Sequence, residues 1–350
     1  MGTDFIPTKK WAIIIPPDMS QVEKSAADLS RCIALLTQAV KGNPLAGEIE
    51  KKPEIFRAFD PMPNDDFSLI VLNCDNSCSS RNGFEWRAGS ERVEIFGESL
   101  RGLCNGIYSF LAALGISWPL VGQEKLPSQG VSLKCNNVCE PSLFDGDNPA
   151  AAPFKRFMPS GLREIKTILS KSEAFVTWAA RNCYDAIILP LAVFASKKSV
   201  NSLNSLRKCA GDYGIVLEAG GRDFSTFVPR KYFLFHRDYF RMEDGQRKKD
   251  YHFCATNPDA IRIIGKEGEK LFRAAREIKV FHLWPSETAW CSCPSCRAFS
   301  TEEQYHIGIN AVADVLATVN PEAVVSFFKT GGNIPLRKNT YKVEKLEVKS

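Results

Sequence analysis

The sequence predicts an α/β protein in two parts: an N-terminal α+β sandwich domain at residues 1–122, and a (β/α) TIM-like barrel at residues 154–350 that is incomplete at its C-terminal end. Three observations support this prediction. Apolar strand-like runs alternate with amphipathic helical patterns along the chain. Residues 123–153 are polar, with scattered Pro, Gly, Ser and Asn, which is typical of a linker. Beyond this linker, strands and helices repeat without hairpins, which predicts a parallel sheet.

The front domain shows both strand and helix patterns. An apolar run at residues 11–15 stops at two prolines, and Ser20 with Glu23 then matches a capping box that begins a helix. Apolar residues recur at three- and four-residue spacing until Gly42, so one face of this helix is expected to pack on a sheet. Further expected elements are a strand at 67–72, a hairpin at 84–87 and 92–96, and a helix at 100–114.

The second part reads as strands separated by helices. Strands are expected at 155–158, 186–191, 215–217, 280–283 and 323–328, and helices at 163–181, 200–213, 257–276 and 302–319. Asn257 followed by Pro258 fits a helix cap and the first helical position. A complete barrel needs eight strands. Few residues follow Phe328, so either the barrel is truncated or the architecture is a reduced one.

Charge and cysteine content limit the classes of partner. The net charge of +5 comes from 45 basic and 40 acidic residues without a long basic run, so no nucleic-acid partner is expected. Residues 1–10 lack the apolar stretch of a signal peptide, and no eighteen apolar residues run together. We therefore expect a cytoplasmic protein without a membrane partner. In that setting the twelve cysteines are expected to be free thiols.

Three cysteines within six residues form the strongest local signal. Cys291, Cys293 and Cys296 can supply three of the four ligands that zinc needs from one tight loop. Cys254 follows the third expected strand, next to the strand that precedes the cluster, and is the expected fourth ligand. The possible substitutes are His252, His282 and His306. Free or redox-active thiols, including a reversible disulfide, are the alternative interpretation.

Two glutamates are candidate catalytic residues. Glu287 follows the expected strand at 280–283, and barrel enzymes carry out their chemistry at the carboxyl ends of their strands. Glu218 holds the equivalent position at the third strand. Arg222 and Asp223 follow paired glycines there and could contact a substrate. The alternatives are a solvated loop glutamate at 287 and a turn with a surface ion pair at 218.

Three rings are candidate substrate-binding groups. Trp284 and Trp290 flank Glu287, and indole rings stack on the apolar faces of sugars, although core packing explains them equally well. His236 lies among aromatic residues, where a structural histidine is the alternative interpretation.

The residues from 154 to about 328 resemble domain-of-unknown-function family 4838, a presumed glycoside-hydrolase-like barrel. The resemblance rests on Trp284-Pro-Ser-Glu287-Thr-Ala-Trp-Cys291-Ser-Cys293-Pro-Ser-Cys296-Arg-Ala-Phe299, and then on Gln304-Tyr305 and Asn310-Ala-Val-Ala313. It extends back through Trp178-Ala-Ala-Arg181-Asn182, Gly220-Gly221, residues 236–240, Gly245-Gln-Arg247 and Phe253-Cys254-Ala-Thr-Asn257-Pro258. The cysteine loop is also similar to that of the zinc-containing β-galactosidases of glycoside hydrolase family 42. That likeness implies structural zinc at Cys254, Cys291, Cys293 and Cys296.

The front domain is similar to the N-terminal domain that precedes the barrel in α-glucuronidases and β-hexosaminidases. The residues that carry this likeness are the helix from Ser20 to Gly42, Ile95-Phe-Gly97, the stretch from Arg101 to Leu111, and Leu114-Gly115-Ile-Ser-Trp118. Together the two resemblances imply a glycoside hydrolase-like protein with a carbohydrate ligand or substrate.

Three functions stay open at this point. The first is a glycoside hydrolase in which Glu287 protonates the leaving oxygen, Glu218 or Asp223 assists, and zinc braces the loop. The usual route needs two carboxylates, whereas substrate-assisted cleavage of an N-acetyl sugar needs fewer. The second is a non-catalytic carbohydrate-binding or degenerate barrel protein, and the third is a thiol-based metal or redox sensor. A homodimer that covers the open barrel is also possible.

Overall fold

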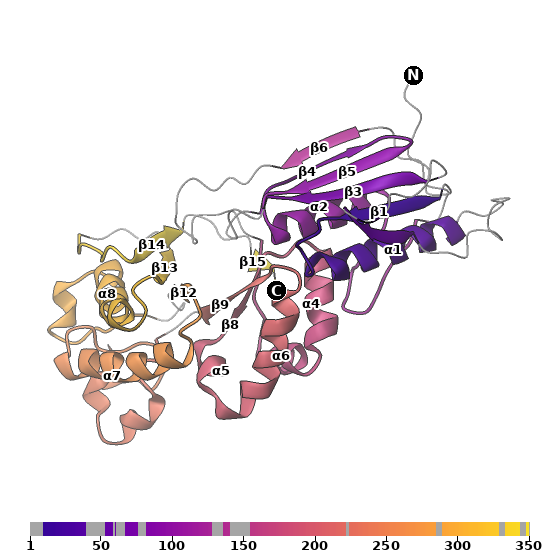
Figure 1. The fold of residues 1–350 in the computed structure, drawn as a ribbon. Helices are drawn as coiled ribbons and strands as arrows, with labels where there is room; N and C mark the ends of the chain where they lie inside the picture. The colour runs from indigo at the N-terminus through magenta and orange to yellow at the C-terminus, as the bar shows by residue number, and fades with distance from the viewer. Residues whose placement is uncertain are drawn as a thin grey trace.

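The front domain is a sheet with two helices on one face. The computed structural model describes residues 10–39, 53–58, 60, 67–75, 82–127, 136–140, 155–221, 224–284, 289–328, 333–343 and 348–349. The six-stranded front sheet has the order β2-β1-β3-β5-β4-β6. Its strands are β1 (Trp11–Ile15), β2 (Glu54–Arg57), β3 (Ser68–Cys74), β4 (Phe84–Ala88), β5 (Arg92–Gly97) and β6 (Asn136–Glu140). Helices α1 (Val22–Ala39) and α2 (Leu100–Ala113) cover one face (Figure 1).

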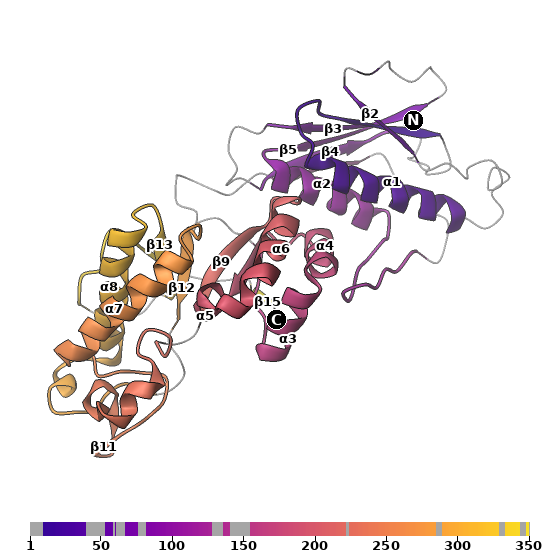
Figure 2. The same ribbon diagram turned by 60° about the horizontal axis from the view of Figure 1, so that its bottom comes forward.

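The second part is a parallel sheet of seven strands in the order β14-β13-β12-β9-β8-β7-β15. The strands are β7 (Arg156–Phe157), β8 (Ala186–Leu189), β9 (Val216–Gly221), β12 (Val280–Leu283), β13 (Val324–Phe328), β14 (Thr340–Val343) and β15 (Val348–Lys349). The helices are α3 (Leu162–Ser170), α4 (Ser172–Arg181), α5 (Leu191–Ala195), α6 (Val200–Gly211), α7 (Pro258–Ala274) and α8 (Thr301–Val319). Helices α7 and α8 lie side by side (Figure 2).

The edges of this parallel sheet are close together. Strands β14 and β15 lie at opposite edges, yet Val343 and Val348 are separated by only five peptide units. Five extended residues span at most about 18 Å, whereas seven flat strands spaced by about 4.8 Å would be about 29 Å across. The sheet therefore curves into a barrel-like arrangement, which confirms the predicted α/β fold class.

Most predicted elements are present, and the differences have physical reasons. The predicted hairpin is the antiparallel pair β4–β5, and Asn257 caps α7 by accepting from the backbone N–H groups of Asp259 and Ala260. Strand β6 lies within the predicted linker and pairs with β4 at the sheet edge, so the front sheet includes residues beyond 122. The polar sequence of β6 shows no apolar strand pattern, so this strand was not predicted. The predicted helix at 163–181 is broken at Lys171 into α3 and α4. Strands β14 and β15, and the hairpin of β10 (Met242–Glu243) with β11 (Gln246–Arg247), are too short for a sequence pattern.

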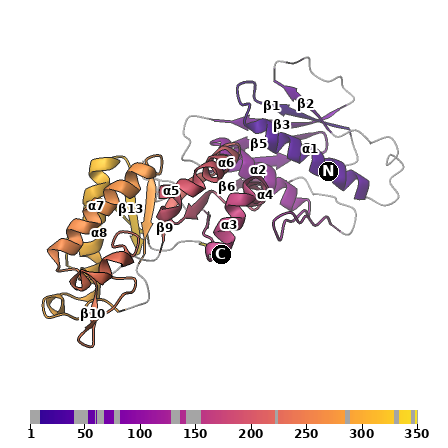
Figure 3. The same ribbon diagram turned by 90° about the horizontal axis from the view of Figure 1, so that it is seen from below.

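Salt bridges join the front domain to the barrel part. Helix α4 packs against α2, as Figure 3 shows from below. The guanidinium of Arg181 on α4 makes two 2.7 Å hydrogen bonds with Asp28 on α1. Arg31 bridges Asp28 to Glu124, with its Nη2 2.6 Å from a Glu124 carboxylate oxygen. The two parts are therefore held by charged groups that are mostly buried. No helix among the described residues is long and apolar enough to cross a membrane.

Acidification is expected to weaken this junction. The hydrogen bond from Arg31, with help from the Trp118 indole, holds the pKa of Glu124 at about 2, below the ordinary value of about 4.3 that applies in the unfolded chain. Glu124 therefore contributes its full stabilisation above about pH 5 and loses it as the pH falls towards 2. Urea unfolding of wild type and Glu124→Gln should differ at pH 6 and converge near pH 2.5. The exposed Glu173 supplies the control Glu173→Gln, and a difference that stays constant across this range would contradict the assignment.

Candidate metal centre and carboxylate site

Four buried cysteines meet beside the parallel sheet. The sulfur atoms of Cys254, Cys291, Cys293 and Cys296 all lie within 4.8 Å of one another. Sγ of Cys254 is 3.7 Å from Sγ of Cys293 and from Sγ of Cys296. A tetrahedral zinc ion with Zn–S bonds of about 2.3 Å keeps its sulfur atoms about 3.8 Å apart. The spacing therefore fits a metal ion with four thiolate ligands, and the prediction that Cys254 joins the cluster is confirmed.

The three histidines that could have replaced a cysteine are engaged elsewhere. His252 stacks on Trp290, with ring centroids 4.2 Å apart and planes 18° apart. His282 and His306 hydrogen-bond to groups outside the cluster. The donor set is therefore sulfur alone, which suits zinc or another thiophilic ion and does not suit calcium or magnesium.

Two loops that follow adjacent strands supply the cysteines. Cys254 lies in the long connection between β9 and α7, after the β10–β11 hairpin. The other three cysteines follow β12, the neighbour of β9 in the sheet. Two hydrogen bonds join these connections. Ser292 N donates to Met242 O at 2.8 Å, and Met242 N donates to Sγ of Cys291 at 3.2 Å. Parallel strand order therefore brings the cluster together at the carboxyl ends of two strands.

Groups around the cluster orient its ligands. The amide of Gln304 on α8 accepts from the backbone N–H of Cys291 at 3.1 Å and donates to the carbonyl oxygens of Cys291 and Cys296. Arg247 lies 3.7 Å from Sγ of Cys291 and brings positive charge to it. Hydrogen bonds with the thiols of Cys291 and Cys296 hold the pKa of Cys254 well below its ordinary value. Such outer contacts fix ligand geometry and tune the charge of a metal site.

Both tryptophans beside the cluster are buried. Trp290 is 6% exposed and packs on His252 and against the edges of Phe224 and Phe253. Trp284 is 3% exposed, and its backbone N–H donates to the carbonyl of Gly221 at 2.9 Å. Packing accounts for these positions, and a role in sugar stacking stays a prediction.

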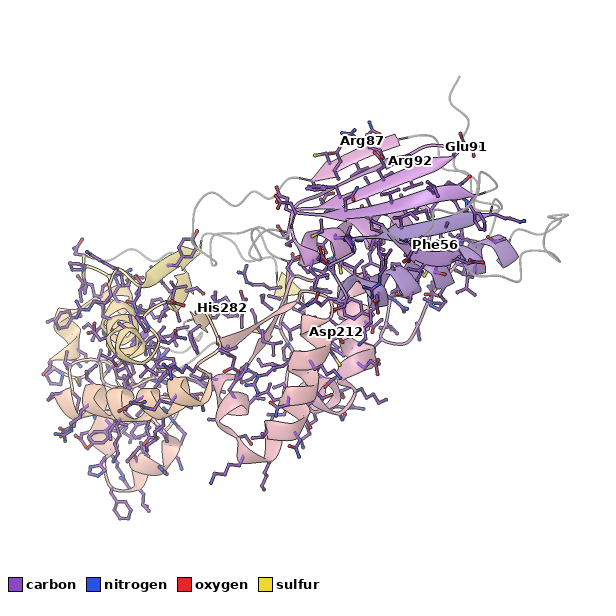
Figure 4. The ribbon with its side chains drawn as sticks, viewed as in Figure 1. Phe56, Arg87, Glu91, Arg92, Asp212 and His282 are labelled. Atoms are coloured by element: carbon purple, nitrogen blue, oxygen red, sulfur yellow. The ribbon has the colours of Figure 1, made fainter. Side chains whose placement is uncertain are left out.

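Glu218 belongs to a buried polar network inside the barrel. Arg156 on β7 holds its carboxylate with two hydrogen bonds of 2.7 and 3.1 Å. His282 on β12 (labelled in Figure 4) lies 2.8 Å from the same carboxylate through Nε2, and its Nδ1 lies 2.5 Å from the Ser326 hydroxyl. All four side chains are almost fully buried. Burial opposes ionisation of Glu218, but the positive charge of Arg156 and the interactions with His282 outweigh it and lower its pKa to about 2. Such a carboxylate keeps its charge and is a poor proton donor.

Of the remaining predicted site residues, the structure describes only His236. Glu287, Arg222 and Asp223 lie outside the described residues. His236 is exposed, and its ring stacks on Tyr239 with centroids 4.7 Å apart. Its role in substrate binding stays a prediction.

The sequence interpretation missed three partners in these sites: Arg156, Ser326 and Gln304. Arg156 is a charged residue within a short strand-like run, and such a residue signals a buried ionic partner when the strand turns out to be internal. The polar Ser326 within an apolar strand gives a similar, weaker signal. Gln304 belongs to the Gln304-Tyr305 pair that carries part of the family resemblance, but nothing in the helical pattern of α8 indicates its contact with the cluster.

The chain is an α/β protein with a barrel-like parallel sheet and a buried cluster of four cysteines. Residues 194–329 match the family described as "Domain of unknown function (DUF4838)". No curated protein matches the sequence at a significant level.

Several solved structures with a similar fold are described as family 20 glycoside hydrolases. The chain is similar to a chitobiase of Flavobacterium johnsoniae (TM-score 0.57, 12% identity, 98% of this chain and 52% of that one). It is similar to the β-N-acetylhexosaminidases of Streptomyces coelicolor (0.55, 10%, 98% and 66%) and Bacteroides fragilis (0.52, 12%, 98% and 67%). The chain thus spans about half to two thirds of these proteins. At such low identity the likeness shows a shared fold: a front domain followed by a barrel-like region.

Proposed function

We propose that this protein is a glycoside hydrolase in which Glu287 is the general acid and a structural zinc ion braces the loop that carries it. The observation that carries the proposal is the position of Glu287 in the sequence between two fixed points. Trp284 directly follows β12, and its backbone N–H donates a hydrogen bond to the carbonyl of Gly221 at the end of β9. Cys291 belongs to the cysteine cluster. Barrel enzymes perform catalysis at this end of their strands, and the fold is shared with family 20 hydrolases.

Zinc is proposed as the metal because four buried thiols are its preferred closed ligand set. A site with four protein ligands has no open position, so the metal would hold two loops together rather than bind substrate. It would be held by Cys254, Cys291, Cys293 and Cys296. Loops fixed in this way limit the positions that Glu287 can sample, and precise positioning of a proton donor contributes strongly to rate.

Cleavage of a 2-acetamido sugar fits the available groups best. Glu287 would donate its proton to the glycosidic oxygen as the C1–O bond breaks, while the acetamido oxygen of the substrate attacks C1 and takes the place of a protein nucleophile. Water then opens the cyclic intermediate and returns a proton to Glu287. Glu218 is held by Arg156 and His282, so it would keep its charge and order the barrel interior rather than transfer a proton.

A second candidate is a protein that binds carbohydrate without cleaving it. The observation in its favour is the buried polar network around Glu218. The Glu218 carboxylate forms an ion pair with Arg156 and is 2% exposed. Glu218 is therefore not available as the second carboxylate that the usual hydrolytic routes need. Binding of sugar without turnover would distinguish this candidate from the hydrolase.

Replacing Glu287 with glutamine is expected to reduce glycoside cleavage by about 10²- to 10⁴-fold, the usual contribution of a general acid. The assay measures kcat/KM on 4-methylumbelliferyl N-acetyl-β-glucosaminide and on the matching glucoside. The control is Glu269→Gln, a half-exposed glutamate on α7 that pairs with Arg273. Its activity should stay within about twofold of wild type.

The outcomes of this assay separate the candidates. Loss of activity in Glu287→Gln with retained activity in Glu269→Gln supports the hydrolase. Equal activity of Glu287→Gln and wild type removes Glu287 from the mechanism. Wild type that binds N-acetylglucosamine but cleaves neither substrate favours the binding protein.

A further inference from the structure

A cavity of about 750 Å³ lies between the front domain and the barrel part. Its walls come from α2, β4 and β6 on one side and from the end of α4 and the starts of β7 and β8 on the other. Figure 1 labels α2, β4, β6, α4 and β8. Lys155 directly precedes β7 and Asp185 directly precedes β8. The cavity is therefore at the amino ends of the barrel strands, whereas the cysteine cluster is at their carboxyl ends. Its size and its place between domains are those of ligand pockets.

The charged groups that line this cavity leave no excess of positive charge. Arg181 makes two 2.7 Å bonds with Asp28, and Asp185 pairs with Arg101. The Lys155 ammonium donates to the carbonyl of Asn182 at 2.5 Å and keeps its charge. The same lining carries the carboxylate of Glu140, which balances that charge. A lining without excess positive charge disfavours phosphates, nucleotides and acidic sugars.

The other lining groups are neutral. Amide and hydroxyl groups come from Asn82, Ser109 and Ser117, and the apolar lining consists of the exposed Ala112 with the largely buried Phe84 and Trp118. Together they present hydrogen-bonding groups beside apolar surface. A sugar has the matching character, with an apolar face of C–H groups and a rim of hydroxyls.

A strained residue in the wall is a second, independent observation. Cys183 has φ of 56°, in the left-handed region, where it ends α4 with its N–H bonded to the Ala180 carbonyl. Glycine is the usual residue at such a helix end, and a side chain there is disfavoured because its Cβ crowds the following carbonyl oxygen. The Cys183 side chain lines the cavity. Strain of this kind is concentrated at ligand-binding positions, where a side chain is needed despite its cost.

We infer that this interdomain cavity binds a neutral sugar or a polyol of similar size, at a site separate from Glu287. The exposed Glu140 at its edge adds a negative charge that further disfavours acidic ligands. The site would let the front domain hold a carbohydrate while the opposite face of the barrel is free. Its ligand does not depend on whether the barrel is a hydrolase or a binding protein.

Protection of a thiol from alkylation tests this inference on the full chain. Cys139 on β6 is exposed and lines the cavity, whereas burial raises the pKa of Cys183 to about 11 and keeps it unreactive. The rate of Cys139 alkylation by iodoacetamide is measured by peptide mass spectrometry, with Cys209 on α6 as the internal control. The probes are N-acetylglucosamine, glucose and, as the acidic counterpart, glucuronate. Two variants on α2 complete the test: Ala112→Trp, which fills the cavity, and Ala113→Trp beside it, which does not.

The expected result is that at least one neutral sugar, at a concentration above twice its Kd, slows alkylation of Cys139 by more than about threefold and leaves Cys209 unchanged. Ala112→Trp should lose this protection and Ala113→Trp should retain it. The inference is overturned by an absence of protection, by equal protection in Ala112→Trp, or by protection from glucuronate alone.

Discussion

Replacing Cys293 with serine is expected to destabilise the barrel part by on the order of 3–5 kcal/mol, because metal binding and folding are coupled at closed thiolate sites. A serine hydroxyl at neutral pH is a poor zinc ligand, and Cys293 is 5% exposed, so its partners cannot simply turn to water. Loss of one ligand should also release the bond between Ser292 and Met242 that joins the two loops. The measurement is the urea midpoint, followed by far-ultraviolet circular dichroism and by the near-ultraviolet signal of the buried Trp290.

Cys209→Ser is the matched control for this variant. Cys209 is half-buried on α6 and is not part of the cysteine cluster, so its replacement should cost less than about 1 kcal/mol. Treating wild type with a strong chelator should reproduce the loss seen in Cys293→Ser, and added zinc should restore it. Equal midpoints for Cys293→Ser, Cys209→Ser and wild type would show that the cluster carries no structural metal.

Replacing Arg156 with methionine is expected to cost about 3–5 kcal/mol, the usual effect of leaving a buried charge without its partner. Arg156 and Glu218 are both 2% exposed, and two hydrogen bonds join them. In the wild type the lowered pKa of Glu218 means that its contribution is complete above about pH 5 and is lost as the pH falls towards 2. In Arg156→Met the pKa of Glu218 should rise, so the loss of stability relative to wild type should shrink as the pH falls.

The double variant Arg156→Met with Glu218→Gln separates the charge from the packing. It should recover much of the stability lost by Arg156→Met, because no unpaired charge remains. Arg207→Met is the control, since Arg207 pairs with Glu277 on the surface and such pairs contribute less than about 1 kcal/mol. If Arg156→Met and the double variant lose the same stability at every pH, the ion pair does not stabilise the barrel interior.

Elements with a strong local pattern could be predicted from the sequence. The strands at Trp11–Ile15 and Val280–Leu283 have the predicted bounds, because each is a continuous apolar run with a clear end. Helix α7 has a cap and a proline that mark its start. Strand β6 could not be predicted, because a sheet edge faces water and its residues are polar. Strands β14 and β15 are defined by their pairing with β13 and β7, which a local sequence pattern does not reveal.

The candidate site was predictable where sequence and strand order act together. Three of its cysteines are local in the sequence, and Cys254 joins them because β9 and β12 are neighbours in a parallel sheet. The network around Glu218 was not predictable. Its members come from four strands and meet only through the interior of the curved sheet, so no spacing along the chain links Arg156 to Ser326. The interdomain cavity depends in the same way on packing between distant segments.

The most direct test of the account is the metal in the purified full-length chain. The proposal of a structural zinc ion at the four cysteines predicts about one zinc ion per chain by elemental analysis, and a zinc K-edge spectrum with four sulfur ligands at about 2.3 Å. Cys293→Ser should lose the ion or replace one sulfur ligand with oxygen or nitrogen. Freshly purified chain that contains no stoichiometric metal, with all four thiols of the cluster free to react, would contradict the account.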